Sequence, residues 1–172
     1  MTTWKIDNAH SEIGFKVKHM MFTNVSGRFD KYDGTITANG SSLADAKATF
    51  TAEISSINTG NADRDNHLRS ADFFNSEVNN ELKFESTSVT GSGSYQMTGD
   101  LTLNGITKSI TLAVEYSGEM TDPWGNTKAA IQATGTINRK DFGLNWNSML
   151  ETGGVLVGED VKLNIELQLI KA

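Results

Sequence analysis

The last strand-like segment of the chain constrains the fold most. Between Asp160 and Ile170, apolar residues occupy every second position and polar or charged residues lie between them. Side chains along a β-strand point alternately to opposite faces, so this pattern gives one wet face and one dry face. Related segments recur along the chain and predict an all-β protein. We expect these eight strands: Glu12–His19, Val25–Thr37, Ala46–Ile54, Leu82–Val89, Ser94–Asn104, Ile106–Gly118, Thr127–Ile137 and Asp160–Ile170.

The turns favour antiparallel neighbours. Asn104-Gly105 stands between two alternating segments, which is the strongest short-range signal of a β-hairpin. Eight antiparallel strands with one apolar face each can stack as two sheets or close into one barrel. The long strands and hairpin connections favour an extended eight-stranded antiparallel barrel. A barrel of this size is either filled by side chains or holds one small ligand, and the alternation does not distinguish the two.

One segment, Asn61–Phe74, has a helical pattern instead. Arg64, His67 and Leu68 fall at positions i, i+3 and i+4, which places them on one face of a helix. A helix inserted between strands most simply covers an open end of the barrel. The segment Arg139–Leu150 fits no strand pattern, and we expect a second short helical or irregular connection there.

Composition excludes several classes of function. The 172 residues show no linker or repeat, so we expect a single domain spanning 1–172. The net charge of −6 argues against a nucleic-acid partner, and the absence of cysteine removes disulfides and thiolate chemistry. No apolar run reaches membrane-spanning length. The N-terminus has no signal-peptide pattern, so we expect a cytoplasmic protein, or a periplasmic one if this is a processed or recloned mature chain.

A search for catalytic groups yields no nucleophile. The sequence contains no G-x-S-x-G elbow, metal-binding H-E-x-x-H or P-loop motif. Asp7, His10 and Ser11 have the residue types of a hydrolase triad, but their crowding along an extended chain disfavours the required geometry. His19 is in phase with the apolar face of its strand, so it is either a rim histidine or a contact for a ligand headgroup. We predict no catalytic residue, metal site or cofactor.

Strand phase selects candidates for a ligand-binding wall inside the barrel. They share an inward position on a predicted strand and are Phe15, Val17, His19, Phe29, Phe50, Phe84, Leu103, Leu112, Val114, Leu163 and Ile165. Four further residues carry positive charge or an imidazole near a predicted barrel end, and we expect them at the rim, where a headgroup would lie: Arg64, His67, Arg69 and Lys108. For Arg64 a purely structural ion pair, and for Lys108 a solvated position, remain alternatives.

Many short motifs occur together in a recognisable order. They are Trp4-Lys5-Ile6-Asp7, Ala9-His10-Ser11, Gly27-Arg28-Phe29, Arg64-Asp65, His67-Leu68, Asp72-Phe73-Phe74, Phe84-Glu85-Ser86, Gly99-Asp100-Leu101-Thr102-Leu103, Thr107-Lys108, Asp141-Phe142-Gly143-Leu144 and Val157-Gly158-Glu159-Asp160-Val161. With these motifs the chain resembles the bacterial YceI-like, polyisoprenoid-binding family along nearly its whole length. It departs from that family at Asn79-Asn80, where Tyr-Pro is common, and this change affects the loop that leaves the helical segment.

The resemblance implies a lipocalin-like barrel with a long isoprenoid chain in its pore, commonly in a homodimer and without established catalytic residues. We therefore expect binding, sequestration or transport of an amphiphilic isoprenoid-type lipid, such as a polyprenyl compound or a quinone precursor. One alternative is an enzyme that acts on a lipophilic substrate by proton transfer through His19 or His67. Another is a stress-related interaction protein whose barrel is solid.

Overall fold

Eight antiparallel strands form a closed barrel in the computed structural model, which describes residues 1–20, 22–39, 42–147 and 156–172. The strands follow one another around the ring in the order β11, β9, β8, β7, β5, β4, β1 and β12, and β11 also pairs with β12, which closes it. The fold prediction is therefore confirmed. The ring strands are β1 (Thr2–Ile6), β4 (Tyr32–Asn39), β5 (Ser42–Glu53), β7 (Glu81–Ser92), β8 (Ser94–Leu103), β9 (Ile106–Tyr116), β11 (Thr127–Asn138) and β12 (Val157–Lys171).

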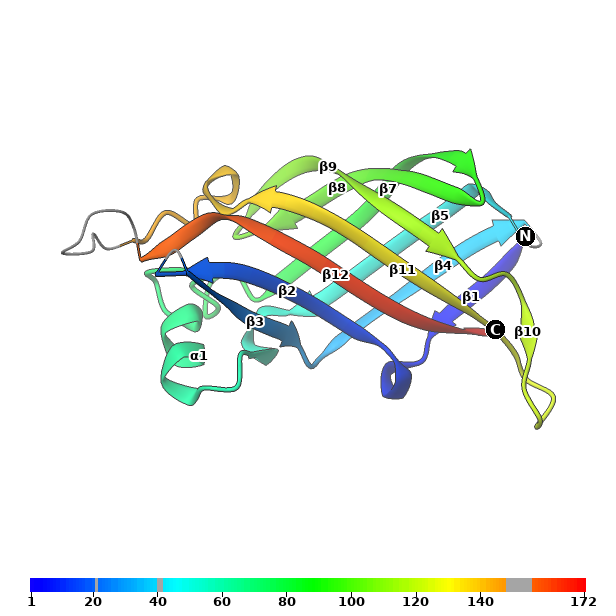
Figure 1. The fold of residues 1–172 in the computed structure, drawn as a ribbon, viewed down its shortest axis with the longest axis horizontal. Coiled ribbons are helices and arrows are strands. Elements are labelled where there is room, and N and C mark those ends of the chain that lie inside the picture. The colour runs from blue at the N-terminus through cyan, green and yellow to red at the C-terminus, as the bar shows by residue number, and fades with distance from the viewer. Residues whose placement is uncertain (21, 40–41, 148–155) are drawn as a thin grey trace.

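Shorter strands extend the barrel at one end. On one edge of β12, residues 169–171 pair with β1, and residues 157–166 pair with β2 (Glu12–His19). β2 then pairs with β3 (Thr23–Phe29), which pairs with β6 (Ile57–Asn58). The remaining short strand, β10 (Met120–Thr121), pairs with β11. The long β12 thus spans both the ring and its extension, as Figure 1 shows.

The predicted strands differ from the structure in two ways. The predicted strand Val25–Thr37 is divided into β3 and β4 at Asp30 and Lys31. There the side chain of Arg28 donates to Asp30 over 2.8 Å, and the Lys31 N–H donates to a serine hydroxyl. These local bonds replace part of the ladder and let the strand change direction. The strands β1, β6 and β10 were not among the predicted strands, because they are only five, two and two residues long.

The helix α1 (Ala62–Arg69) lies at the end of the barrel opposite the two termini (Figure 1). The Asn61 side chain caps it by accepting the Arg64 N–H over 3.0 Å. The helix is shorter than predicted because the Ser70 hydroxyl donates to the His67 carbonyl, which ends the helical ladder. Short 3-10 turns complete the fold: η1 (Asn8–His10), η2 (Ile54–Ser56) and η3 (Arg139–Phe142). η3 opens the predicted irregular connection, whose residues 148–150 lie outside the described residues.

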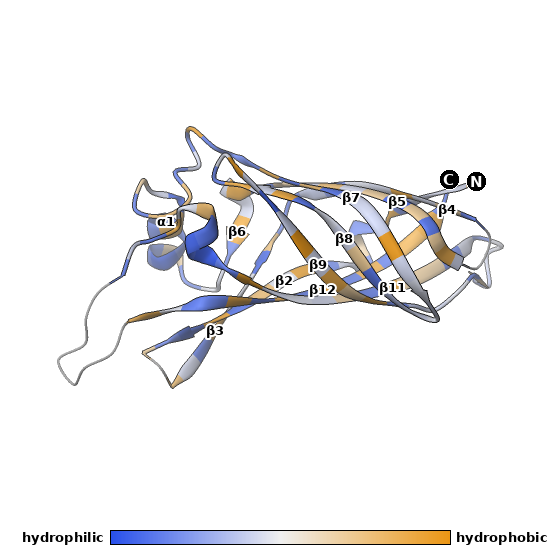
Figure 2. Ribbon diagram, turned by 90° about the horizontal axis from the view of Figure 1, so that it is seen from above, coloured by the Kyte–Doolittle hydropathy of each residue, from blue (hydrophilic) through white to orange (hydrophobic). Residues whose placement is uncertain are grey.

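The strands alternate polar and apolar residues, as the colours of Figure 2 show. On β12 the residues at 163, 165 and 167 face the interior, and those at 162, 164 and 166 face out. The side chains of Trp4 and Leu169, near the termini, are completely buried, as is Ile54 in η2 at the other end of β5. The chain therefore places its apolar faces on the inside of one continuous wall.

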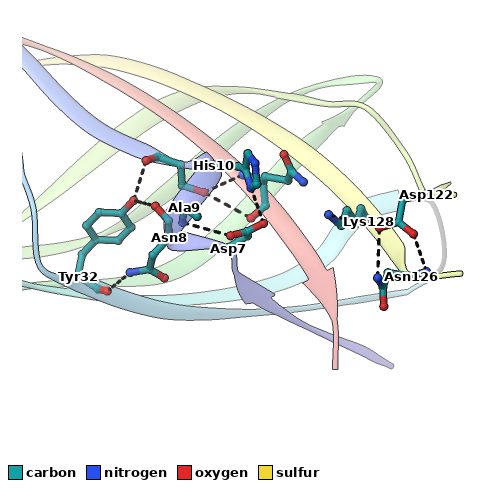
Figure 3. A network of polar contacts seen from close by, with 10 residues as sticks. Asp7, Asn8, Ala9, His10, Tyr32, Asp122, Asn126 and Lys128 are labelled. Carbon is teal, nitrogen blue, oxygen red and sulfur yellow. Dashed lines mark hydrogen bonds and ion pairs between the residues drawn. The ribbon is translucent and has the colours of Figure 1, made fainter. Parts of the chain in front are cut away.

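Polar contacts fix the corner between β1 and β2 (Figure 3). The Asp7 carboxylate accepts the Ala9 N–H and pairs with the His10 ring over 2.9 Å. The Ser11 hydroxyl instead accepts the Gln168 N–H on β12 over 2.9 Å. His10 and Ser11 thus have separate partners, so the structure shows a corner that anchors η1 rather than a catalytic triad.

This corner gives a pH-dependent prediction. The hydrogen bond from His10 holds the pKa of Asp7 below its usual value. Ionised Asp7 therefore stabilises the fold above its unfolded-state pKa, and this contribution is lost as the pH falls through the lowered folded-state pKa. Asp7→Asn, which keeps a capping oxygen, should lower the free energy of unfolding by only about 0.5 kcal/mol near neutral pH, because the His10 side chain of the pair is exposed to solvent. Urea titrations at several pH values should show the difference shrink as the pH falls through the lowered pKa of Asp7, whereas a constant difference would contradict the ionic origin.

Candidate ligand-binding cavity

The barrel encloses a cavity of about 320 Å³. Its wall includes residues from the ring strands, from the extension β2, β3 and β6, and from α1. On β12 the lining runs from Val157 to Leu167, so the hollow part follows most of this strand. The volume lies at the lower end of the range typical of small-molecule sites. The interior is therefore hollow, and the expectation of a barrel that is solid throughout is wrong.

The lining is strongly apolar. Of the 40 described residues that line the cavity, none is an aspartate or a glutamate. The polar minority comprises two threonines and five side chains with a positive charge or an imidazole: Lys18, His19, Arg64, His67 and Arg139. All five come from β2, α1 or η3, near the end of the barrel that α1 covers. The cavity thus combines an apolar shaft with a basic end.

All eleven predicted wall residues lie in this lining. They are Phe15, Val17, His19, Phe29, Phe50, Phe84, Leu103, Leu112, Val114, Leu163 and Ile165. Phe15 and Phe29, from neighbouring strands, also contact each other with ring centroids 5.7 Å apart. The structure brings these residues together around one space, and whether they contact a ligand stays a prediction.

The four predicted rim residues separate into two pairs. Arg64 and His67 line the cavity, whereas Arg69 and Lys108 do not. Arg69 lies in the last turn of α1, and its guanidinium donates to the Asn66 side chain on the same helix and to the Ser55 carbonyl. Lys108 is exposed on β9. A position near a barrel end was therefore not enough to place a long side chain in the cavity, because such side chains also reach outward to solvent.

Arg64 is held by Thr59 rather than by a carboxylate. Its Nε donates to the Thr59 hydroxyl and one terminal nitrogen donates to the Thr59 carbonyl, both over 2.7 Å. Asp65, the next residue, accepts the N–H and the hydroxyl of the same threonine. Arg64 and Asp65 thus both form hydrogen bonds with Thr59, in the loop before α1. These hydrogen bonds hold the guanidinium at the edge of the cavity.

His67 occupies an aromatic corner of the cavity. Its ring packs edge-on against Phe73 and Trp146, with centroids 5.1 and 4.7 Å away. Its Nε2 pairs with the Asp72 carboxylate over 2.9 Å. The imidazole is therefore positioned from two sides by packing and from a third by a hydrogen bond. Phe73 and Trp146 also line the cavity, and neither was among the predicted wall residues.

Arg139 is the least expected residue at this end. Its side chain is only 3% exposed, and burial lowers the pKa of its guanidinium. It donates to the carbonyls of Leu144, Trp146, Val157 and Gly158. A buried arginine with these partners ties η3 and the segment after it to the start of β12. Strand alternation does not mark such a residue in advance.

The other lining residues that were not predicted are mostly in strand phase. Met97, Leu101, Ile131 and Ala133 share the inward face of β8 or β11 with the cavity wall. The same alternation that selected Leu112 selects them, so the signal was present. Among the described residues, no group of three His, Asp or Glu side chains is placed to hold a metal ion.

The architecture and the cavity together define a lipocalin-like barrel protein. The chain belongs to the YceI-like family, since the model of the YceI-like domain matches residues 4–169. A UPF0312 protein of Staphylococcus aureus strain N315 is 44% identical over 163 residues, which is 94% of each chain. The described part of the chain contains no helix that is long and apolar enough to span a membrane.

Solved structures agree with this assignment. The YceI protein of Campylobacter jejuni superposes with a TM-score of 0.78 at 33% identity, covering 97% of this chain and 96% of that one. Burkholderia cenocepacia BcnA superposes with a TM-score of 0.82 at 20% identity, covering 95% and 98%. A polyisoprenoid binding domain from Saccharophagus degradans shares the fold with a TM-score of 0.68 at 17% identity, covering 98% of each chain. At these lower identities the last two show the fold alone.

Proposed function

We propose that this protein binds an amphiphilic isoprenoid-type lipid with its hydrocarbon tail inside the barrel and acts as a carrier or reservoir for it. The observation that supports this most is the hollow interior, whose lining is apolar apart from a few residues, most of them gathered at the α1 end. Water fills such a space poorly, whereas a hydrocarbon tail removes both its own apolar surface and that of the wall from water.

The tail supplies most of the binding free energy in this proposal. Burying ~400 Å² of isoprenoid surface at ~25 cal/mol per Å² is worth about 10 kcal/mol, before association costs of several kcal/mol. An exposed ion pair between a headgroup and the rim adds about 0–1 kcal/mol. The wall therefore decides whether a lipid binds, and the rim decides which end of the lipid points outward.

The basic end of the cavity favours a polar or anionic headgroup beside α1. Arg64 and His67 line this end and are held in place by Thr59 and Asp72. The lining described here includes no carboxylate, although the Asp72 carboxylate lies next to it and pairs with the His67 imidazole. The lipid thus enters tail first and leaves its headgroup beside these two side chains.

We propose binding rather than catalysis. The histidines of the enzyme alternative, His19 and His67, do line the cavity. His67, however, is packed against two aromatic rings and paired with Asp72, an arrangement that suits a fixed contact as well as a proton donor. The name of the Saccharophagus degradans domain describes a polyisoprenoid ligand for that protein, so this architecture is compatible with such a ligand.

Native mass spectrometry tests the proposal directly. Protein purified gently from its own host should carry a co-bound lipid with an isoprenoid mass, or should take up added polyprenol stoichiometrically. If the protein carries no co-bound lipid and also takes up no added polyprenol, the proposal is overturned. In the same assay, Arg64→Gln should reduce any preference for a polyprenyl phosphate over the matching polyprenol by up to about fivefold, the effect of an exposed ion pair.

A further inference from the structure

The cavity ends before the barrel does. On the ring strands β1, β4, β5, β8, β9, β11 and β12, an inward-facing residue still follows the last lining residue toward the termini and does not line the cavity. On β12, for example, Leu167 lines the cavity, whereas Leu169 is completely buried and does not. We name these seven residues the floor layer: Trp4, Ala38, Ala46, Tyr95, Tyr116, Ala129 and Leu169.

The floor layer is densely filled. It combines three large rings with three alanines and a leucine, and such mixtures of large and small side chains fill the interior of small barrels. The Trp4 side chain is fully buried, and Tyr95 is 6% exposed. The Tyr95 hydroxyl also accepts the N–H of Leu43, itself 1% exposed, over 3.3 Å. Side chains therefore fill this end of the barrel, and the Tyr95 side chain is held there by a hydrogen bond. The rest of the barrel toward α1 is hollow.

We propose that the floor layer is a length gauge, which stops the hydrocarbon tail and sets how many isoprene units the cavity shelters. This inference rests on the proposed function and adds the determinant of chain length. Each isoprene unit inside the shaft removes apolar surface from water and tightens binding. A unit that does not fit between floor and rim stays in water at the α1 end and adds nothing. Affinity should thus rise with chain length and then reach a plateau.

Two substitutions move the floor in opposite directions. Ala48 lines the cavity directly above the floor residue Ala46 on β5, so Ala48→Leu raises the floor. Trp4→Leu lowers it, because a smaller side chain replaces the indole. The indole nitrogen of Trp4 has no hydrogen-bond partner among the described residues, so this change breaks no polar contact. Lys47→Leu is the matched control, because it adds the same side chain on the outer face of β5.

The experiment titrates each variant by native mass spectrometry with all-trans polyprenols that differ by one isoprene unit. Relative to the native protein, the plateau should come at least one unit earlier in Ala48→Leu and at least one unit later in Trp4→Leu, with no shift in Lys47→Leu. If Trp4→Leu does not fold, Ala48→Leu alone decides the question. Binding with an unchanged plateau in Ala48→Leu overturns the length gauge alone, whereas no uptake by the native protein overturns the proposed function as well.

Discussion

Replacing Leu163 by aspartate should reduce lipid uptake at least about 100-fold while leaving the barrel folded. Leu163 points into the shaft from β12, between Gly135 of β11 and Phe15 of β2. It is only partly buried, so in the empty protein a carboxylate there can remain hydrated. When a hydrocarbon tail enters, the carboxylate must lose that water, which costs several kcal/mol. Uptake of a polyprenol, measured by native mass spectrometry, should report this loss.

Two controls separate charge from shape and position. Asn164→Asp places the same charge on the next residue, which is exposed on the outer face of β12, and should bind normally. Leu163→Asn matches the shape of the aspartate without its charge, and should show an intermediate loss. Circular dichroism and the thermal midpoint check that each variant is folded. Normal uptake by a folded Leu163→Asp variant would mean that the tail does not pass this part of the wall.

The wall of the cavity was predictable because a strand has only two faces. Once the alternation of Val161, Leu163 and Ile165 fixes the inward face of β12, every second residue follows, and the same argument places Leu112 on β9. The physical cause is the two-residue period of the strand, which holds whatever the neighbouring strands are. The closed ring has the predicted number of strands, but β1 belongs to it and the predicted strand Glu12–His19 (β2) does not. The break between β3 and β4 depends on side-chain bonds that no period reveals.

The two ends of the cavity were harder to predict. Arg139 and Trp146 lie in a segment without a regular period, so their approach to the cavity depends on tertiary contacts alone. Arg69 was placed at the rim by its position in sequence, but its guanidinium bonds to Asn66 and Ser55 and does not line the cavity. The floor layer has the same alternation as the hollow shaft. Strand phase predicts which side chains point inward but does not predict whether they fill the space they meet.

Replacing Arg139 by methionine should lower the free energy of unfolding by about 3–5 kcal/mol. Methionine replaces the aliphatic part of arginine but donates no hydrogen bond, so the carbonyls of Leu144, Trp146 and Gly158 lose the donors they have in Arg139. Each buried carbonyl left without a donor costs about 1–3 kcal/mol. The Val157 carbonyl keeps a hydrogen-bond donor in this variant, because the Asn147 side chain also donates to it over 2.8 Å. In a chain of this size the thermal midpoint should fall by roughly 10 °C.

The neighbouring residue provides the control for this prediction. Lys140 pairs with Glu159 over 2.8 Å, but both side chains are about half exposed. Lys140→Met removes a positive charge beside Arg139 and should cost only about 0–1 kcal/mol. Arg139→Lys keeps the positive charge but has a single donor nitrogen. That nitrogen cannot reach the carbonyls after η3 and those on β12 at the same time, so this variant should recover only part of the stability. Equal losses in Arg139→Met and Lys140→Met would show that the charge, and not the bonds to the four carbonyls, holds this end of the barrel together.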